Sequence, residues 1–316
     1  MRNIRDWMKG VRIKSYHNIS LYRFFRIFTY NLQNDNIANW ANGVAFNFIL
    51  AIFPAVIFLF TLIPYVAMLY PEVNRNSIME FMGNLMPPSM YEVVSSTILD
   101  IISNQRGGLL TFGFLFAVYL STNGMLSLMR AFNACYQTVE KRSGLRMRLT
   151  ATGLTFMLAV VLILAVVILV VGQFAINYIT TNISEFSNLN FDAFSIYMIL
   201  LLRFLVIFVM FFIAISFVYY FGPAIHYNWK FFSIGSFIAT LGTLGISYGF
   251  SFYITNFGTY NKVYGSIGVL IALMIWVQLI TVVLLFGYEI NASLHHGIKV
   301  EAIELHKRQM RKVVQE

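Results

Sequence analysis

The sequence predicts an all-α membrane protein, a bundle of six transmembrane helices with both termini on the cytoplasmic side. Three observations predict this fold class. Hydrophobic residues make up 59% of the 316 residues and charged residues only 11%, whereas a soluble domain carries about 25% charged residues. Six apolar stretches each reach the length of about 20 residues that a helix needs to cross a bilayer. Positive charges gather on alternate connections between these stretches.

The segment before the first span, residues 1–40, is basic and aromatic. Within it, residues 20–30 combine Arg23 and Arg26 with Tyr22, Phe24 and Phe28. This mixture is typical of an amphipathic helix that lies on the inner leaflet. The first apolar run begins only near Ala41, which is too late for a cleaved signal peptide. We therefore expect the first span to be retained.

The six predicted spans must be helices, because lipid offers no hydrogen-bond partners to a backbone. They cover about 41–70, 109–134, 150–178, 194–221, 231–255 and 265–294. A β-barrel is excluded because residues 160–171 are apolar without the alternation of a barrel strand. Pro54 and Pro64 interrupt the first span. Each proline removes a backbone hydrogen bond and favours a kink.

The connections set the expected orientation. Most of the 22 lysines and arginines fall in residues 1–40, in the connections after the second and fourth spans, and in the tail 295–316. These parts are therefore expected in the cytoplasm. The outer loop 71–108 contains Ser89 and Glu92 at capping-box spacing, which predicts a second amphipathic helix there. The net charge of +9 then indicates topology and attraction to anionic headgroups, with no nucleic-acid partner.

The fifth span carries small residues three and four positions apart. They are Gly235, Ala239, Gly242, Gly245 and Gly249. Such a stripe lets helix backbones approach closely, and it predicts a packing helix in the bundle. The alternative is one wall of a substrate groove. The stretch 245–249 also matches G-x-S-x-G, but a nucleophile elbow needs a strand-to-helix turn, so we reject that interpretation.

Charged and polar groups inside the spans are candidates for substrate binding. Arg203 lies nine residues into the predicted fourth span, and Glu289 lies near the cytoplasmic end of the sixth. Arg130 is level with Glu289 by helical rise, so the two form either a structural ion pair or a ligand site. Three further candidates could line a cavity or make interhelical hydrogen bonds: Asn123, Gln278 and His226.

Several familiar chemistries find no support in the sequence. No carboxylate lies in the central third of a predicted span, where cation and proton carriers place one. The five histidines have no metal-binding spacing, and no P-loop indicates ATP use. The single cysteine, Cys135, is interpreted as a packing residue. We expect no cofactor, no metal and no enzymatic activity.

Both ends of the predicted bundle carry sequence motifs. The opening span reads ANGVAFNFILAIFP over residues 41–54. The closing span has a Y-G-S-x-G start at Tyr264 and a G-x-E-x-N-A end at Gly287, and Gly222 and Pro223 follow the fourth span. These residues resemble the YihY/BrkB family of bacterial inner-membrane proteins, which implies a location in the bacterial inner membrane. Asn47 departs from the family, whose members commonly carry an aromatic residue there. The resemblance implies a link to envelope lipid movement or serum resistance. The family's former label, ribonuclease BN, implies RNA cleavage.

The leading hypothesis is a transporter or flippase-like protein for an amphipathic anionic lipid or lipid-linked substrate. Arg203 and Arg130 would attract a headgroup phosphate, since a guanidinium forms paired hydrogen bonds to phosphate. The alternatives are a permease for small solutes or cations and a structural or assembly factor of the cell envelope. Nuclease activity is rejected because no residue cluster in the sequence could hold a metal. Membrane lipids are the expected partners, and the oligomeric state stays open.

Overall fold

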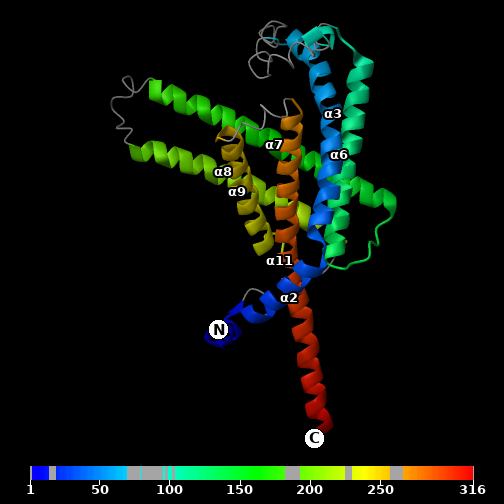
Figure 1. Cartoon of the computed structure of the whole chain (residues 1–316), viewed down its shortest axis with the longest axis vertical. Coiled ribbons are helices and arrows are strands. Elements are labelled where there is room, and N and C mark those ends of the chain that lie inside the picture. The colour runs from blue at the N-terminus through cyan, green and yellow to red at the C-terminus, as the bar shows by residue number, and fades with distance from the viewer. Residues whose placement is uncertain are drawn as a thin grey trace. The chain divides into compact units, whose positions relative to one another are not determined.

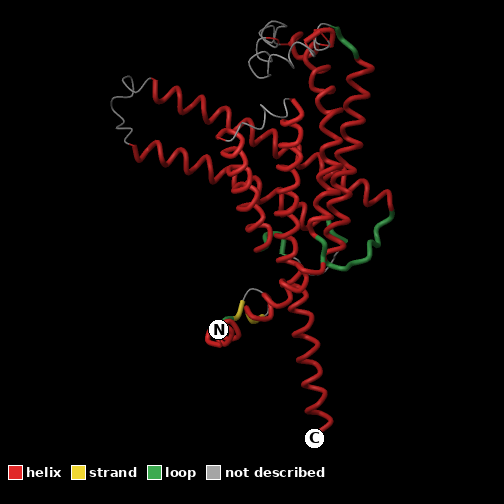
Figure 2. The backbone as a smooth tube through the Cα atoms, in the orientation of Figure 1, coloured by secondary structure: helices red, strands yellow, loops and turns green. Residues whose placement is uncertain are grey.

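The structure is a computed structural model, and the chain is helical in nearly all of the parts it describes (Figure 2). The described residues are 2–13, 19–69, 79, 95–96, 99–101, 104–181, 193–224, 230–256 and 266–315. The exception is a short antiparallel pair near the N-terminus, in which β1 (Arg12–Ile13) lies beside β2 (Ile19–Ser20). Arg12 is opposite Ser20 in this pair.

Two helices precede the spans and six long helices follow (Figure 1). Their bounds are α1 Arg2–Gly10, α2 Leu21–Asn34, α3 Ile37–Leu69, α6 Gly107–Cys135, α7 Gly144–Thr181, α8 Ala193–Phe221, α9 Ile234–Asn256 and α11 Ser266–Gln315. Each of the last six contains a stretch long and apolar enough to cross a membrane. These stretches are Ile37–Tyr65, Gly107–Cys135, Gly144–Ala165, Leu200–Phe221, Ile234–Ile254 and Leu270–Ile298. The predicted six-helix membrane fold is confirmed.

Helix α11 continues well beyond the predicted end of the sixth span. It has 50 residues, which at 1.5 Å per residue is roughly 75 Å, far more than a bilayer needs. Residues 298–315 contain neither proline nor glycine, so nothing in the tail stops the helix. The helix predicted in the outer loop 71–108 falls almost wholly outside the described residues.

Helix α3 remains one helix through both of its prolines. Pro54 and Pro64 are buried. Between them, the Thr61 hydroxyl donates to the carbonyl oxygens of Ile57 and Phe58, both at 2.9 Å. This bond to the carbonyls three and four positions earlier satisfies the threonine hydroxyl within its own helix.

The chain divides into two compact units. The first contains Met1–Trp40, Met129–Gly245 and Val282–Glu316, and the second contains Ala41–Leu128 and Ile246–Thr281. Several of the long helices therefore contribute one part to each unit. Each unit gathers segments that are far apart in the sequence, as is usual for a helical bundle with long connections.

In the second unit α3 packs closely against α6. A Cβ added to Gly113 would lie 3.3 Å from the backbone of Phe58, and one added to Gly124 would lie 2.7 Å from the ring of Phe48. Asn47 donates to the Ser127 hydroxyl at 3.0 Å across the same pair of helices. Small residues and a polar contact are the usual means of joining helices in lipid.

In the first unit three aromatic rings meet at the centre. Phe132 of α6 lies 4.4 Å from Tyr288 of α11 between ring centroids, and Tyr219 of α8 is 5.5 Å from Phe132. All three side chains are buried. Helices α7 and α8 lie side by side in this unit. The aromatic cluster therefore joins α6, α8 and α11 directly beside the G-x-E-x-N-A residues.

Candidate functional site

The end of the sixth span brings α9 and α11 into backbone contact. A Cβ built on Gly235 would lie 2.1 Å from the carbonyl oxygen of Gly287, and one built on Gly287 would lie 2.7 Å from the Gly235 oxygen. Neither position has room for a side chain, because the obstacle is a backbone atom. Gly242 continues the contact, since its Cβ would meet Val283 at 2.7 Å. The glycine of the motif therefore permits a close crossing of the two helices.

Asn291 then completes the first turn of α9. Its Oδ1 accepts a hydrogen bond from the Gly235 N–H at 2.9 Å, and its Nδ2 donates to the Ser233 hydroxyl at 2.8 Å. Ser233 caps α9, because its Oγ accepts from the Ser236 N–H at 3.0 Å. The first N–H groups of a helix have no partner within the helix. Side chains from the cap and from α11 supply these partners inside the bundle.

Glu289, the acidic residue of the motif, holds the N-terminal helix α2. Its side chain is fully buried, and its Oε1 accepts from Asn31 Nδ2 at 2.7 Å and from the Ser293 hydroxyl at 2.9 Å. Phe28 of α2 packs beside this contact against Ile290 and Leu294 of α11. Helix α2 is thus bound to the bundle through one buried face.

Asp35 lies next to this contact, at the C-terminal cap of α2. One carboxylate oxygen of Asp35, one of Glu289 and the Sγ of Cys135 all lie within 4.8 Å of one another. Burial raises the pKa of Asp35, although a hydrogen bond with the Glu289 carboxyl acts in the opposite direction. Asp35 Oδ2 and Glu289 Oε2 are buried, and neither has a hydrogen-bond partner outside this pair of carboxyls. Two carboxyls and a thiol therefore meet in a space shielded from water.

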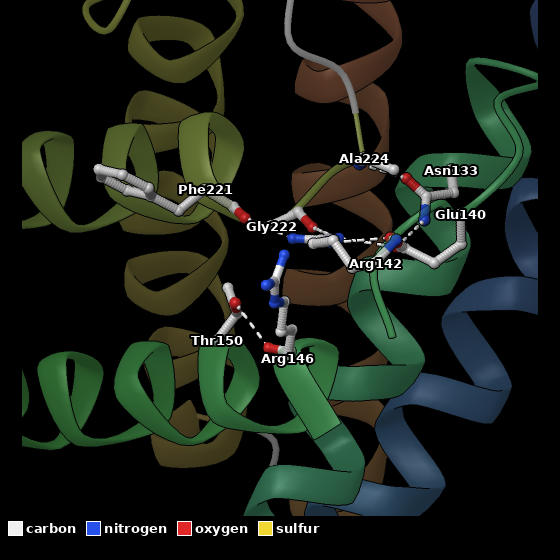
Figure 3. Close-up of polar contacts among 8 residues, drawn as sticks. All are labelled: Asn133, Glu140, Arg142, Arg146, Thr150, Phe221, Gly222 and Ala224. Atoms are coloured by element: carbon white, nitrogen blue, oxygen red, sulfur yellow. Dashed lines mark hydrogen bonds and ion pairs between the residues drawn. The ribbon is translucent and has the colours of Figure 1, made fainter. Parts of the chain in front are cut away.

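A second polar cluster fixes the C-terminal end of α8 (Figure 3). Arg142 donates to the carbonyl oxygens of Phe221 and Gly222 at 3.1 and 2.7 Å. The same guanidinium forms two hydrogen bonds to Glu140, at 2.8 and 2.7 Å. The last carbonyls of a helix have no partner within it and carry partial negative charge. Arg142 therefore caps α8 while its own charge is balanced by Glu140.

Asn133 extends this cluster to α6 and to the Gly222–Pro223 turn. Its Nδ2 donates to Glu140 at 2.9 Å, and its Oδ1 accepts from the Ala224 N–H at 2.8 Å. The hydrogen bond from Arg142 is the main cause that lowers the pKa of Glu140 to about 2. We call Asn133, Glu140, Arg142 and the carbonyls of Phe221 and Gly222 the α8 cap cluster. It joins the ends of α6 and α8 and the start of α7.

The structure gives Glu289 different neighbours from those the sequence suggested. Arg130 is exposed on α6, whereas Glu289 is fully buried and bonds to Asn31 and Ser293. Helical rise set Arg130 and Glu289 at the same depth but could not say which way the side chains point. The structure therefore contains no ion pair between Arg130 and Glu289.

The other candidates are spread over the two units. Arg203 is half-buried on α8, and a Cβ on Gly172 of α7 would lie 3.6 Å from its Cδ and Nε. Gln278 of α11 donates to Asn42 of α3 at 2.7 Å. Asn123 is half-buried on α6. His226 lies outside the described residues.

The small-residue stripe of α9 divides into two parts. Gly235, Ala239 and Gly242 face α11, with Ala239 fully buried. A Cβ added to Gly245 or Gly249 would meet nothing within 4 Å. The first part is therefore used for close packing, and the second borders open space.

Sequence reasoning missed the partners that α2 and the connections supply. Phe24, Phe28 and Asn31 recur at helical spacing on α2, and that pattern indicates one buried face that ends in a polar residue. The α8 cap cluster had a weaker signal, an acidic and a basic residue two positions apart in a connection. Asp35 and Cys135 have no local signal, because only the folded chain brings them to Glu289.

The ion pair in the α8 cap cluster makes a prediction about pH. The folded-state pKa of Glu140 is about 2, below its ordinary value of 4.5, so its stabilising effect is fully present above about pH 4.5. That effect declines as the pH falls and is lost near pH 2. Glu140→Gln should therefore lower the melting temperature in detergent at pH 7, and the difference from the unchanged protein should shrink between pH 5 and pH 3.

Asp6→Asn serves as the matched control, since Asp6 forms an exposed pair with Lys9 at 3.5 Å. An exposed pair contributes little to stability, so this variant should have the same melting temperature as the unchanged protein from pH 7 to pH 3. A melting difference for Glu140→Gln that stays constant from pH 7 to pH 3 would contradict the assignment.

Comparison with known proteins identifies the family. The model of the virulence factor BrkB family matches residues 28–312. A ribonuclease-like protein, YfkH of Bacillus subtilis, is 31% identical over 257 residues, which cover 81% of this chain and 90% of that protein. A UPF0761 membrane protein of Pseudoalteromonas atlantica is 24% identical over 94% of this chain and 89% of its own length. One of Idiomarina loihiensis is 25% identical over 91% and 95%.

No solved structure matches the chain. The match to the family model covers nearly the whole sequence, from α2 to the end of α11, and so includes the α9–α11 contact and the G-x-E-x-N-A residues. The chain therefore belongs to the virulence factor BrkB family of membrane proteins.

Proposed function

We propose that the chain is a transporter of the flippase type that moves an amphipathic anionic lipid or lipid-linked substrate, without an ATPase of its own. The observation that carries the proposal is the position of Arg203 on α8. Its neighbours Leu201, Leu202, Phe204 and Leu205 each expose more than half of their surface. Exposed apolar side chains in a membrane span face acyl chains.

A guanidinium in such surroundings suits the phosphate of a lipid. It can form two parallel hydrogen bonds to phosphate while the neighbouring leucine and phenylalanine side chains contact the tails. Helix α8 begins at Ala193, so Arg203 lies ten residues, roughly 15 Å, from its start. From that depth the long arginine side chain can extend toward the headgroups, where its charge is tolerated.

The opposite end of the same helix pair is also cationic. Arg146 is exposed at the start of α7, and Lys141 and Arg130 are exposed close by in the sequence. Between Arg146 and Gly172, the neighbour of Arg203, α7 rises roughly 39 Å, about one bilayer thickness including headgroups. We place the Arg146 end in the cytoplasm, together with both termini, by the positive-inside rule. A headgroup would then meet a cation near the cytoplasmic end of the helix pair and a second one, Arg203, toward the other end.

Arg203 provides the direct test of lipid handling. The full chain is reconstituted in vesicles with a fluorescent phosphatidylglycerol, and movement between leaflets is followed by quenching of the outer leaflet. Arg203→Ala should lower the rate by about tenfold or more, and Arg203→Lys should lower it less, because lysine keeps the charge but loses the paired hydrogen bonds. The matched control is Arg26→Ala, an exposed arginine on α2 that should leave the rate unchanged.

Four outcomes would contradict the proposal in different ways. A rate equal to that of protein-free vesicles would remove transport and favour an envelope assembly factor. Equal rates for phosphatidylglycerol and a zwitterionic lipid would remove the anionic preference. Normal translocation per folded molecule by Arg203→Ala, with a lower melting temperature, would make Arg203 structural. Uptake of a small soluble ion without lipid movement would favour the permease.

We also propose that the chain does not cleave RNA, although one relative is named ribonuclease-like. The acidic residues that cluster in the structure include Glu289, which is fully buried, so a polymer cannot reach it. Purified protein should leave labelled RNA intact with and without divalent metal. Cleavage that follows the protein through purification and disappears in Glu289→Gln would contradict this prediction.

A further inference from the structure

We infer that Asp35, Cys135 and Glu289 form a binding site for a divalent metal ion of the zinc class. The site joins the end of α2, the end of α6 and the last part of the apolar region of α11. It is separate from the lipid-handling residues and does not depend on the proposed transport.

The geometry of the three side chains is close to that of a metal site. Their potential ligand atoms all lie within 4.8 Å of one another. Zinc binds sulfur at about 2.3 Å and carboxylate oxygen at about 2.0–2.2 Å, so tetrahedral ligands stand roughly 3.5 Å apart. The three atoms would have to move closer together by side-chain rotation to reach that spacing. Cys135 is buried and forms no disulfide, so its thiol is free to take part.

The Glu289 carboxylate is oriented as a metal ligand usually is. Its Oε1 accepts hydrogen bonds from Asn31 and Ser293, which fix the plane of the group. Its Oε2 is buried, as is Asp35 Oδ2, and neither oxygen has a hydrogen-bond partner outside the pair of carboxyls. Hydrogen bonds from neighbouring side chains commonly orient carboxylate ligands in this way. A buried oxygen without a donor is costly unless something else satisfies it.

The local charge also favours a cation. Two carboxyls lie together, and no lysine or arginine in the described part of the chain forms a salt bridge with either. Like charges at this distance disfavour each other's ionised form, and a divalent cation removes that conflict. A divalent cation bound between the two carboxyls would therefore balance their charge.

The donor set selects the class of metal. Calcium and magnesium prefer oxygen ligands alone. A thiolate with carboxylates suits zinc, which takes three protein ligands and leaves a fourth position for water. On binding, the Cys135 thiol gives up its proton to solvent, as does a carboxyl that still holds one. No redox change is needed, and the bound ion would fasten α2 to α6 and α11.

Cobalt provides a spectroscopic test because Cys135 is the single cysteine of the chain. Untagged full-length protein in detergent is titrated with Co²⁺ alone. We expect about one ion per chain and a thiolate-to-cobalt charge-transfer absorption, displaced by Zn²⁺. Cys135→Ser should abolish that absorption. Asp35→Asn and Glu289→Gln should weaken binding by at least about tenfold, whereas the exposed Asp6→Asn should bind as the unchanged protein does.

The unchanged protein decides the question even where a variant fails to fold. Its charge-transfer absorption can come only from Cys135, and its absence with cobalt in excess would overturn the site. Zn²⁺ should also raise the melting temperature of the unchanged protein and leave that of Cys135→Ser unchanged. If folded Asp35→Asn and folded Glu289→Gln bind the metal as tightly as the unchanged protein does, the site is likewise overturned.

Discussion

The backbone contact between α9 and α11 is the constraint on which the rest of the first unit depends. In lipid the hydrophobic effect does not drive helices together, so close packing and interhelical hydrogen bonds must hold them. At Gly235 and Gly287 the two helices approach until no Cβ fits at either position. This approach fixes the rotation of α11, and the rotation decides which of its side chains face α9 and which face α2.

The remaining motif residues follow from that rotation. Asn291 reaches the first turn of α9, and Glu289 faces α2, where Asn31 donates to it. Tyr288 packs against Phe132 of α6 and Tyr219 of α8. Arg142 then caps the C-terminal end of α8 from the connection before α7. The closing motif is therefore explained as a set of helix contacts, while lipid handling is proposed for α7 and α8, where exposed apolar side chains surround Arg203.

The sequence predicts the fold better than the site, for a physical reason. The requirement that backbone groups in lipid bond within their own segment leaves only helices, so hydropathy alone locates six spans. The depth of a residue along its helix is also predictable, and by helical rise Arg130 and Glu289 lie at the same depth. Direction around the helix is not, because it depends on the crossing at Gly235 and Gly287. The partners of Glu289 lie on α2 and at its end, and a span-by-span analysis does not consider them.

Thermal unfolding of two glycine variants in detergent tests the central constraint most directly. Gly235→Ala places a Cβ 2.1 Å from a backbone oxygen and should cost roughly 1–3 kcal/mol, with a clearly lower melting temperature. Gly245→Ala meets nothing within 4 Å on the same helix and should be neutral or stabilising by up to about 1 kcal/mol. Equal melting temperatures for the two variants, or a greater loss for Gly245→Ala, would contradict the account.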